Sequence, residues 1–221
     1  MTKTVLRTAL LAAALVTAAP AFATKPFNAA YTADYMGMKA TGRMTIEPAD
    51  GHWRYTLHVG NQLADLTQTT VFDDAGGVLR PLSGTDTAKA FIKKQRKNAS
   101  YDWSRGVATW TGDVKPDRAG PIRLQAGDVD ALLVNLAIAR DVAAGKPLSY
   151  RMVDNGRVRQ LSYTVSGKEM INVGGRSQQA TRVVSTNGEK KTTLWVVPGV
   201  PVPVRILQTN DGDGIDIRIA E

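Results

Sequence analysis

The segment 128–140 reads DVDALLVNLAIAR, and it decides the predicted fold. It is made of good helix formers, with Asp128 at the expected N-cap and a second acid, Asp130, in the first turn. Because Gly145 is a typical residue just past a helix end, we expect one α-helix over about residues 128–143. At about 100° per residue its apolar side chains point almost all the way round, which indicates a helix buried on every side.

The chain before this helix alternates between apolar and polar residues, as strands do. From His52 to Val59 one face would carry Trp53, Tyr55, Leu57 and Val59, and the other His52, Arg54, Thr56 and His58. The segment 27–35 alternates less cleanly, and the segment 67–72 is rich in β-branched residues. The segment 44–47 predicts a short strand that ends at Pro48.

Turn residues divide these segments. Asn155-Gly156 between two alternating runs is the strongest hairpin signal, because both turn positions need positive φ. Turns recur about every ten residues, which is typical of a meander of antiparallel strands. The sequence therefore predicts a mainly β fold, a curved antiparallel sheet or incomplete β-barrel wrapped around the one apolar helix.

The N-terminus has the three parts of a secretory signal peptide. Lys3 and Arg7 give a positive start, a short apolar stretch follows, and small residues stand at Ala21 and Ala23. The apolar stretch is shorter than the roughly 20 residues that a bilayer span needs. We therefore expect export to the periplasm, with cleavage between Ala23 and Thr24.

The expected organisation is a signal peptide over residues 1–23 and a single exported mainly β domain over 24–221. Cleavage lowers the formal net charge from +8 to +6, since Lys3 and Arg7 are removed. The chain has no cysteine, which excludes disulfides, thiolate metal sites and a lipid-modified cysteine. No later segment is apolar enough to cross a membrane, so no transmembrane anchor is expected after cleavage.

Catalytic motifs are missing from the sequence. The two histidines, His52 and His58, would lie about 20 Å apart on the outward face of one strand, too far to share a metal ion. A hydrolase would need a cleft with a carboxylate of raised pKa, and the sequence shows no such cluster. We therefore predict no catalytic residues, no metal site and no cofactor.

The densest basic run is Lys93, Lys94, Arg96 and Lys97. One interpretation is contact with an anion of the envelope, such as a lipid head group or lipopolysaccharide, rather than nucleic acid. The other is a solvated strand end or exposed hairpin, where lysines prevent aggregation between strand edges. Both interpretations stay open at this point.

Several short motifs together resemble one protein family. They are Tyr31 with Gly42, Gly77-Val78-Leu79-Arg80-Pro81, Tyr101-Asp102-Trp103, Gln125-Ala126-Gly127-Asp128, Leu194-Trp195-Val196-Val197 and Val200-Pro201-Val202-Pro203-Val204-Arg205. On these residues the chain resembles the exported bacterial domain-of-unknown-function family 3108 (DUF3108), over nearly its whole length after the leader. The resemblance implies an exported, mainly β single domain and no particular reaction.

Three functions remain as hypotheses. The first is a non-enzymatic periplasmic protein that binds a lipid or other envelope component, in a hydrophobic cavity between sheet and helix. The second is an envelope assembly or protein-interaction factor that uses exposed strand edges or an apolar patch. The third is a hydrolase acting on cell-wall polymer.

Overall fold

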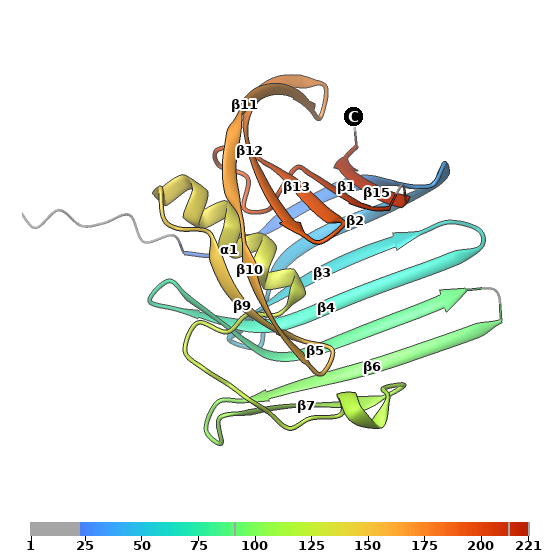
Figure 1. Ribbon diagram of the computed structural model, residues 1–221, viewed down its shortest axis with the longest axis vertical. Helices are drawn as coiled ribbons and strands as arrows, with labels where there is room; N and C mark the ends of the chain where they lie inside the picture. Colours follow the sequence, from blue (N-terminus) through green and yellow to red (C-terminus); the bar gives the residue numbers. More distant parts are fainter. Residues whose placement is uncertain (1–22, 91, 212, 221) are drawn as a thin grey trace, which may run out of the picture.

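The computed structural model describes residues 23–90, 92–211 and 213–220 (Figure 1). The signal peptide expected over residues 1–23 lies outside these residues, apart from Ala23. In the described part the chain is mainly β, with a single α-helix, α1, Ala131–Ala144. No helix there has the length and apolar character that a bilayer span requires.

Fifteen strands account for most of the described chain. They are β1 Phe27–Tyr35, β2 Met38–Ala49, β3 His52–Gly60, β4 Ala64–Ala75, β5 Val78–Ala90, β6 Lys93–Asp102, β7 Val107–Gly112, β8 Ile122–Arg123, β9 Ser149–Asp154, β10 Arg157–Ser162, β11 Thr164–Val173, β12 Arg176–Asn187, β13 Lys190–Val196, β14 Arg205–Asn210 and β15 Asp213–Ile219. A short 3-10 helix, Pro116–Arg118, lies between β7 and β8.

Thirteen of the strands form one antiparallel sheet, in the order β11-β12-β13-β14-β15-β1-β2-β3-β4-β5-β6-β7-β8. The strands β9 and β10 form a separate hairpin. The expected mainly β class and the antiparallel meander are therefore confirmed. The sheet does not close into a barrel within the described residues, because β11 and β8 are its two edge strands.

One face of the large sheet packs against α1, and we call it the helix face. Its main core cluster joins α1 to strands on both sides of β1, including Met44, Tyr55 and Phe72 on one side and Val183 and Leu194 on the other. Tyr55 and Leu57 are buried as the alternation of β3 predicted. The helix supplies Leu132, Leu133, Val134, Leu136, Ile138 and Ala139 to the core. Its burial on several sides confirms the sequence prediction.

The helix begins later than expected. Its N-cap is Asp130, whose side chain accepts a hydrogen bond from the Leu133 amide and another from the hydroxyl of Thr70 on β4. Asp128, the expected N-cap, instead accepts hydrogen bonds from the Gln125 amide and from Arg151 on β9. Asp130 therefore caps the helix and bonds to β4, whereas Asp128 bonds to β9. Gly145 ends the helix in the left-handed region, as predicted.

The other end of α1 is fixed by a buried ion pair. Arg140 donates two hydrogen bonds to Asp74 on β4, at 2.9 and 2.7 Å, and a third to the Thr24 hydroxyl at 2.6 Å. The Thr24 backbone nitrogen also donates to Asp74, at 2.7 Å. Since α1 contacts Thr70 at its start and Asp74 near its end, it covers only part of the length of β4. In Figure 1 the strands β3 to β6 extend well beyond it on the right.

Two local predictions have opposite outcomes. Asn155 and Gly156 have φ of 48° and 64° and join β9 to β10, which confirms the hairpin. The short strand ending at Pro48 is wrong, because β2 continues to Ala49. The neighbouring strand β1 pairs with β2 only as far as Ile46, so Pro48 lies where one side of β2 has no partner strand that needs a backbone donor.

Candidate functional site

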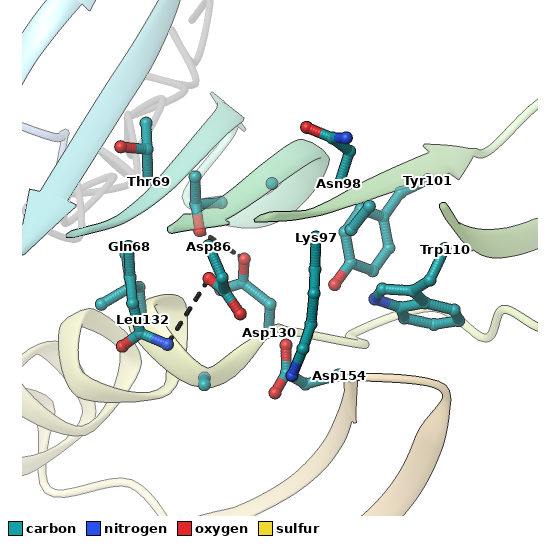
Figure 2. Close-up of a pocket in the computed structure, with 14 residues that line it drawn as sticks. Gln68, Thr69, Asp86, Lys97, Asn98, Tyr101, Trp110, Asp130, Leu132 and Asp154 are labelled. Carbon is teal, nitrogen blue, oxygen red and sulfur yellow. Dashed lines mark hydrogen bonds between the residues drawn. The ribbon is translucent and has the colours of Figure 1, made fainter. Parts of the chain in front are cut away.

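A small polar cleft lies on the helix face beside the N-terminus of α1 (Figure 2). We call it the acidic cleft, after the carboxyl groups that line it. Its volume is about 20 Å³, which is room for about one water molecule. Its polar lining includes Gln68, Asp86, Lys97, Tyr101, Asp130 and Asp154.

Three elements bring the carboxyl groups together. Asp86 comes from β5, Asp130 caps α1, and Asp154 is the last residue of β9. Lys97 lies directly opposite Asp86 in the pairing of β5 with β6, so the two side chains share the helix face. In Figure 2 the side chain of Lys97 extends toward Asp154.

Burial dominates the electrostatics of the cleft. It raises the pKa of Asp130 to about 6, although hydrogen bonds from Thr70 and the Leu133 amide oppose the shift. Burial, together with the charges of Asp130 and Asp86, raises the pKa of Asp154 to about 7. Burial also raises the pKa of Asp86, while Lys97 and Gln68 act in the opposite direction. The cleft can therefore hold protons near neutral pH.

The β9–β10 hairpin closes one side of the acidic cleft. The Tyr101 hydroxyl donates to the Val153 carbonyl oxygen at 2.9 Å, and Lys97 Nζ lies 3.4 Å from the Asn155 side-chain oxygen. Burial raises the pKa of Tyr101 well above its ordinary value, so the hydroxyl stays protonated and keeps this bond. The cleft is thus a junction between helix, sheet and hairpin.

The acidic cleft has carboxyl groups of raised pKa that can hold protons, and space for about one water molecule. Both oxygens of Asp130 are already hydrogen-bonded, which leaves Asp86 and Asp154 as the carboxyl groups with free capacity. Among the described residues no group of three or more histidine, cysteine or acidic side chains has the arrangement for a metal ion. A polymer substrate is far larger than the space available.

Beyond the acidic cleft, the helix face carries apolar side chains that the described residues cover only in part. We call Tyr35, Met38, Val59, Leu66 and Ala88 the open half of the helix face. Strand alternation places them on the same face as the buried core residues of β1 to β5. Tyr35, Met38 and Leu66 are 44%, 52% and 39% exposed. By contrast Met44 and Phe72, further along the same strands, are fully buried.

The residues of the open half form two groups of directly opposite side chains, one on β1 and β2 and one on β3, β4 and β5. Tyr35 lies opposite Met38 in the pairing of β1 with β2. Val59 lies opposite Leu66, and Leu66 lies opposite Ala88. Directly opposite side chains in antiparallel strands are in contact range. On β2, Gly42 rather than Met38 lies opposite Val59, so the two groups are separate apolar clusters on the same face of the sheet.

The basic run predicted from the sequence lies at the start of β6. Lys93, Lys94 and Arg96 are exposed, and Lys97 is half-buried in the acidic cleft. The pairing with β5 places Lys93 and Lys97 on the helix face. The strand β7 pairs only from Lys97 onward, and Asp113 bonds to the backbone nitrogen and oxygen of Arg96, so residues 93–95 form a local edge among the described residues. Contact of these residues with an anion remains a prediction.

The histidines are on the surface, as their spacing predicted. His52 pairs with Asp73 and His58 with Asp65, each across neighbouring strands. A wider depression of about 880 Å³ lies mostly over the opposite face of β15, β1 and β2. Its charged lining includes Asp216, which is already paired with Arg205 and Arg218.

Sequence reasoning missed the acidic cleft. Asp86 and Asp154 stand in strand segments with no motif, 68 positions apart in the chain. The available signal was Asp86, an acid at an inward position of β5. Charged residues are rare at such positions unless an opposite charge or hydrogen bonds stabilise them. Asp130 was identified only as an acid of the first helical turn.

Comparisons with known proteins identify a family and show a distant likeness to solved structures. The model of the family described as "Protein of unknown function (DUF3108)" matches residues 30–218. No curated protein matches the chain in sequence. A solved complex of Pseudomonas aeruginosa MucA and MucB is similar at 12% identity with a TM-score of 0.36, over 88% of this chain and 50% of that chain. A likeness at this level is too low to transfer a partner.

Proposed function

This chain belongs to the DUF3108 family, and from that premise we propose that it binds an amphipathic envelope molecule, a lipid with an anionic head group. The observation that carries the proposal is the open half of the helix face, an apolar surface left uncovered where the rest of the same face is core. Large exposed apolar surfaces mark binding sites in soluble proteins. The proposed place of work is the periplasm, reached through the expected signal peptide.

The cations beside the open half suit an anionic head group. Apolar side chains extend from Val59 on β3 through Leu66 on β4 to Ala88 on β5, and Gln95 on β6 lies opposite Ala88. Lys93 and Lys97 flank Gln95 on the same face. A lipid lying across the strands would rest its chain on Leu66 and place its head group against these ammonium groups.

The proposed site differs from a cavity between sheet and helix. We infer that the sheet curves around α1, because core residues of strands as far apart as β4 and β13 contact the same helix. Side chains such as Leu133 and Phe72 fill the space between them. The open half is then the part of the same concave surface that α1 does not reach.

Binding of a soluble lysophosphatidylglycerol, below its micelle concentration, tests the proposal by titration calorimetry. The double variant Met38→Glu/Leu66→Glu should bind at least about tenfold more weakly, because both side chains form the apolar floor. Val78→Glu is the matched control, since Val78 is 45% exposed and lies at the other end of the sheet. A wild-type chain that does not bind this lipid, or a double variant that binds equally well, overturns the proposal.

One observation favours a hydrolase as a second candidate. The acidic cleft supplies the carboxyl groups of raised pKa that a general acid needs, with Asp154 near neutrality. Its volume fits a water but no sugar ring. If hydrolysis occurs, Asp154→Asn should abolish release of fragments from cell-wall polymer while the folded state persists. Equal activity in the variant, or none in the wild type, excludes this cleft as the active site.

A protein partner is the third candidate, and the edge strand β11 favours it. Its outer edge pairs with no strand among the described residues, and Val165 and Met170 are 59% and 60% exposed. Such an edge can accept an extended peptide through backbone hydrogen bonds. Cross-linking from Met170→Cys in intact cells should trap one defined partner, whereas Val78→Cys should not.

A further inference from the structure

We propose that one end of the large sheet docks on an anionic bilayer surface. The hairpins β1–β2, β3–β4 and β5–β6 all turn at this end, since successive strands of the meander are antiparallel. They lie side by side on the right of Figure 1. We call this the hairpin end. It deepens the proposed function by naming the surface from which the lipid would come.

Exposed apolar side chains are concentrated at the hairpin end. Met36 and Leu63 are 62% and 54% exposed in two of the turns, and Ile92 is fully exposed beside the start of β6. Tyr35, Met38 and Leu66 lie within a few residues of the same turns. At the opposite end, where β2–β3, β4–β5 and β6–β7 turn, Val78 is the single large apolar residue that is comparably exposed in the described chain.

Lysines accompany these apolar side chains. Lys39 follows the β1–β2 turn, Lys89 precedes the β5–β6 turn, and Lys93 and Lys94 follow it. All four are exposed. Lysines near an anionic membrane surface are attracted to it. Charge therefore complements the acidic head groups of an anionic bilayer.

The charge is distributed unevenly along the hairpin end, which would orient it on an anionic surface. The β14–β15 turn at the same end carries Asp211 and Asp213, and the β12–β13 turn carries Glu189 followed by Lys190 and Lys191, all exposed. Near the apolar turns, Asp65 is paired with His58, and Asp34 accepts the Gly37 amide. An anionic surface would thus attract the β5–β6 turn, which carries Lys89, Lys93 and Lys94, more strongly than the acidic β14–β15 turn.

The geometry fits a bilayer better than a protein partner. At about 4.8 Å between strands, the three turns from β1 to β6 extend over roughly 24 Å. Met36, Leu63 and Ile92 stand on separate turn tips of neighbouring hairpins. Separate apolar tips flanked by lysines can enter the interface between head groups and acyl chains. Because Tyr35 and Met38 adjoin these tips, a lipid leaving the bilayer would meet the open half directly.

Sedimentation with vesicles tests the docking. The full processed chain should sediment with vesicles of phosphatidylethanolamine and phosphatidylglycerol, and weakly with phosphatidylcholine vesicles. Met36→Glu/Leu63→Glu should reduce sedimentation at least about tenfold, because it places charge on two tips. Val78→Glu is the control at the opposite end and should sediment like the wild type. All these side chains are exposed, so the variants should fold.

Three outcomes overturn the docking proposal. The first is a wild-type chain that does not sediment with anionic vesicles, and the second is a tip variant that sediments equally. The third is a tip variant that changes only the oligomeric state, which would make this end an interface between copies of the chain.

The lysophosphatidylglycerol titration separates the two proposals. Met36→Glu/Leu63→Glu should keep binding the soluble lipid, since neither residue belongs to the open half. A chain that sediments with vesicles but binds no soluble lipid would retain the docking and refute the proposed function.

Discussion

The two halves of the helix face are built from the same strands and differ in what covers them. On β4, Phe72 and Leu66 point to the same face six residues apart, yet Phe72 is fully buried and Leu66 is 39% exposed. The helix α1 covers the first position and stops short of the second. The alternation along a strand therefore does not show which of its inward-facing residues belong to the core, because the helix that covers them comes from elsewhere in the chain.

The largest difference between the halves should appear in stability. Phe72→Ala should lower the free energy of unfolding by about 3–5 kcal/mol, because it leaves a cavity in the packed core. Leu66→Ala, on the same strand and face, should cost about 1 kcal/mol or less. Denaturant titration of both variants measures the contrast, and equal losses would show that the open half is also core.

Removing the Arg140–Asp74 ion pair tests how much it contributes to holding α1 against the sheet. Arg140→Met should lower the free energy of unfolding by about 2–3 kcal/mol, because the Asp74 carboxylate loses both hydrogen bonds from the guanidinium and keeps only those from Thr24. Arg54→Met removes an exposed pair with Glu47 and should cost less than about 1 kcal/mol. If the two losses are similar, the helix is held by packing alone.

The acidic cleft at the border between the halves predicts a pH dependence. The folded chain keeps a proton on Asp154 up to about pH 7, whereas the unfolded chain loses it near pH 4. The free energy of unfolding should therefore fall as pH rises from about 4 to 7. Asp154→Asn should remove part of this fall and stabilise the chain by about 1–3 kcal/mol at pH 8, with little effect at pH 3.5.

Denaturant titrations over this pH range show whether the free energy of unfolding falls as pH rises. The control Asp117→Asn changes a 69%-exposed side chain and should leave the slope as in the wild type. A fall in stability for Asp154→Asn at pH 8 would contradict the assigned burial of a charge.

The smallest effect is expected from a polar substitution in the open half. Met38→Ser should change the free energy of unfolding by less than about 0.5 kcal/mol, because the side chain is 52% exposed and supports no core residue. Thermal unfolding followed by circular dichroism measures this. A loss of several degrees would place Met38 in the core and shrink the proposed site.

Local patterns predicted much of the fold. The Asn155-Gly156 turn, the alternation of β3 and the all-round apolar helix each depend on residues close in sequence, and the structure confirms all three. The helix start was wrong by two positions at its cap, since Asp128 and Asp130 are equivalent locally. Only Arg151 and Thr70, brought there by β9 and β4, assign them different roles.

The candidate sites depend on contacts that no local pattern contains. Period-two alternation placed Leu57 and Val59 inward, but could not show that α1 covers one and leaves the other half-exposed. Similarly, Asp86 meets Asp154 only because a hairpin folds back over the sheet. Contacts between segments that are far apart in the sequence, rather than the secondary-structure propensity of each segment, form both the open half and the acidic cleft.

The contacts of Thr24 also affect how the protein can be handled. Its backbone nitrogen and hydroxyl both bond to Asp74, and Thr24 is 8% exposed. An affinity tag or fluorophore fused directly before this residue would be attached next to the buried ion pair and would have to fit around it. If processing occurs before Thr24, the nitrogen becomes an ammonium group with an ordinary pKa near 8. Its attraction to Asp74 would then weaken in alkaline buffers, a point to consider when choosing storage conditions.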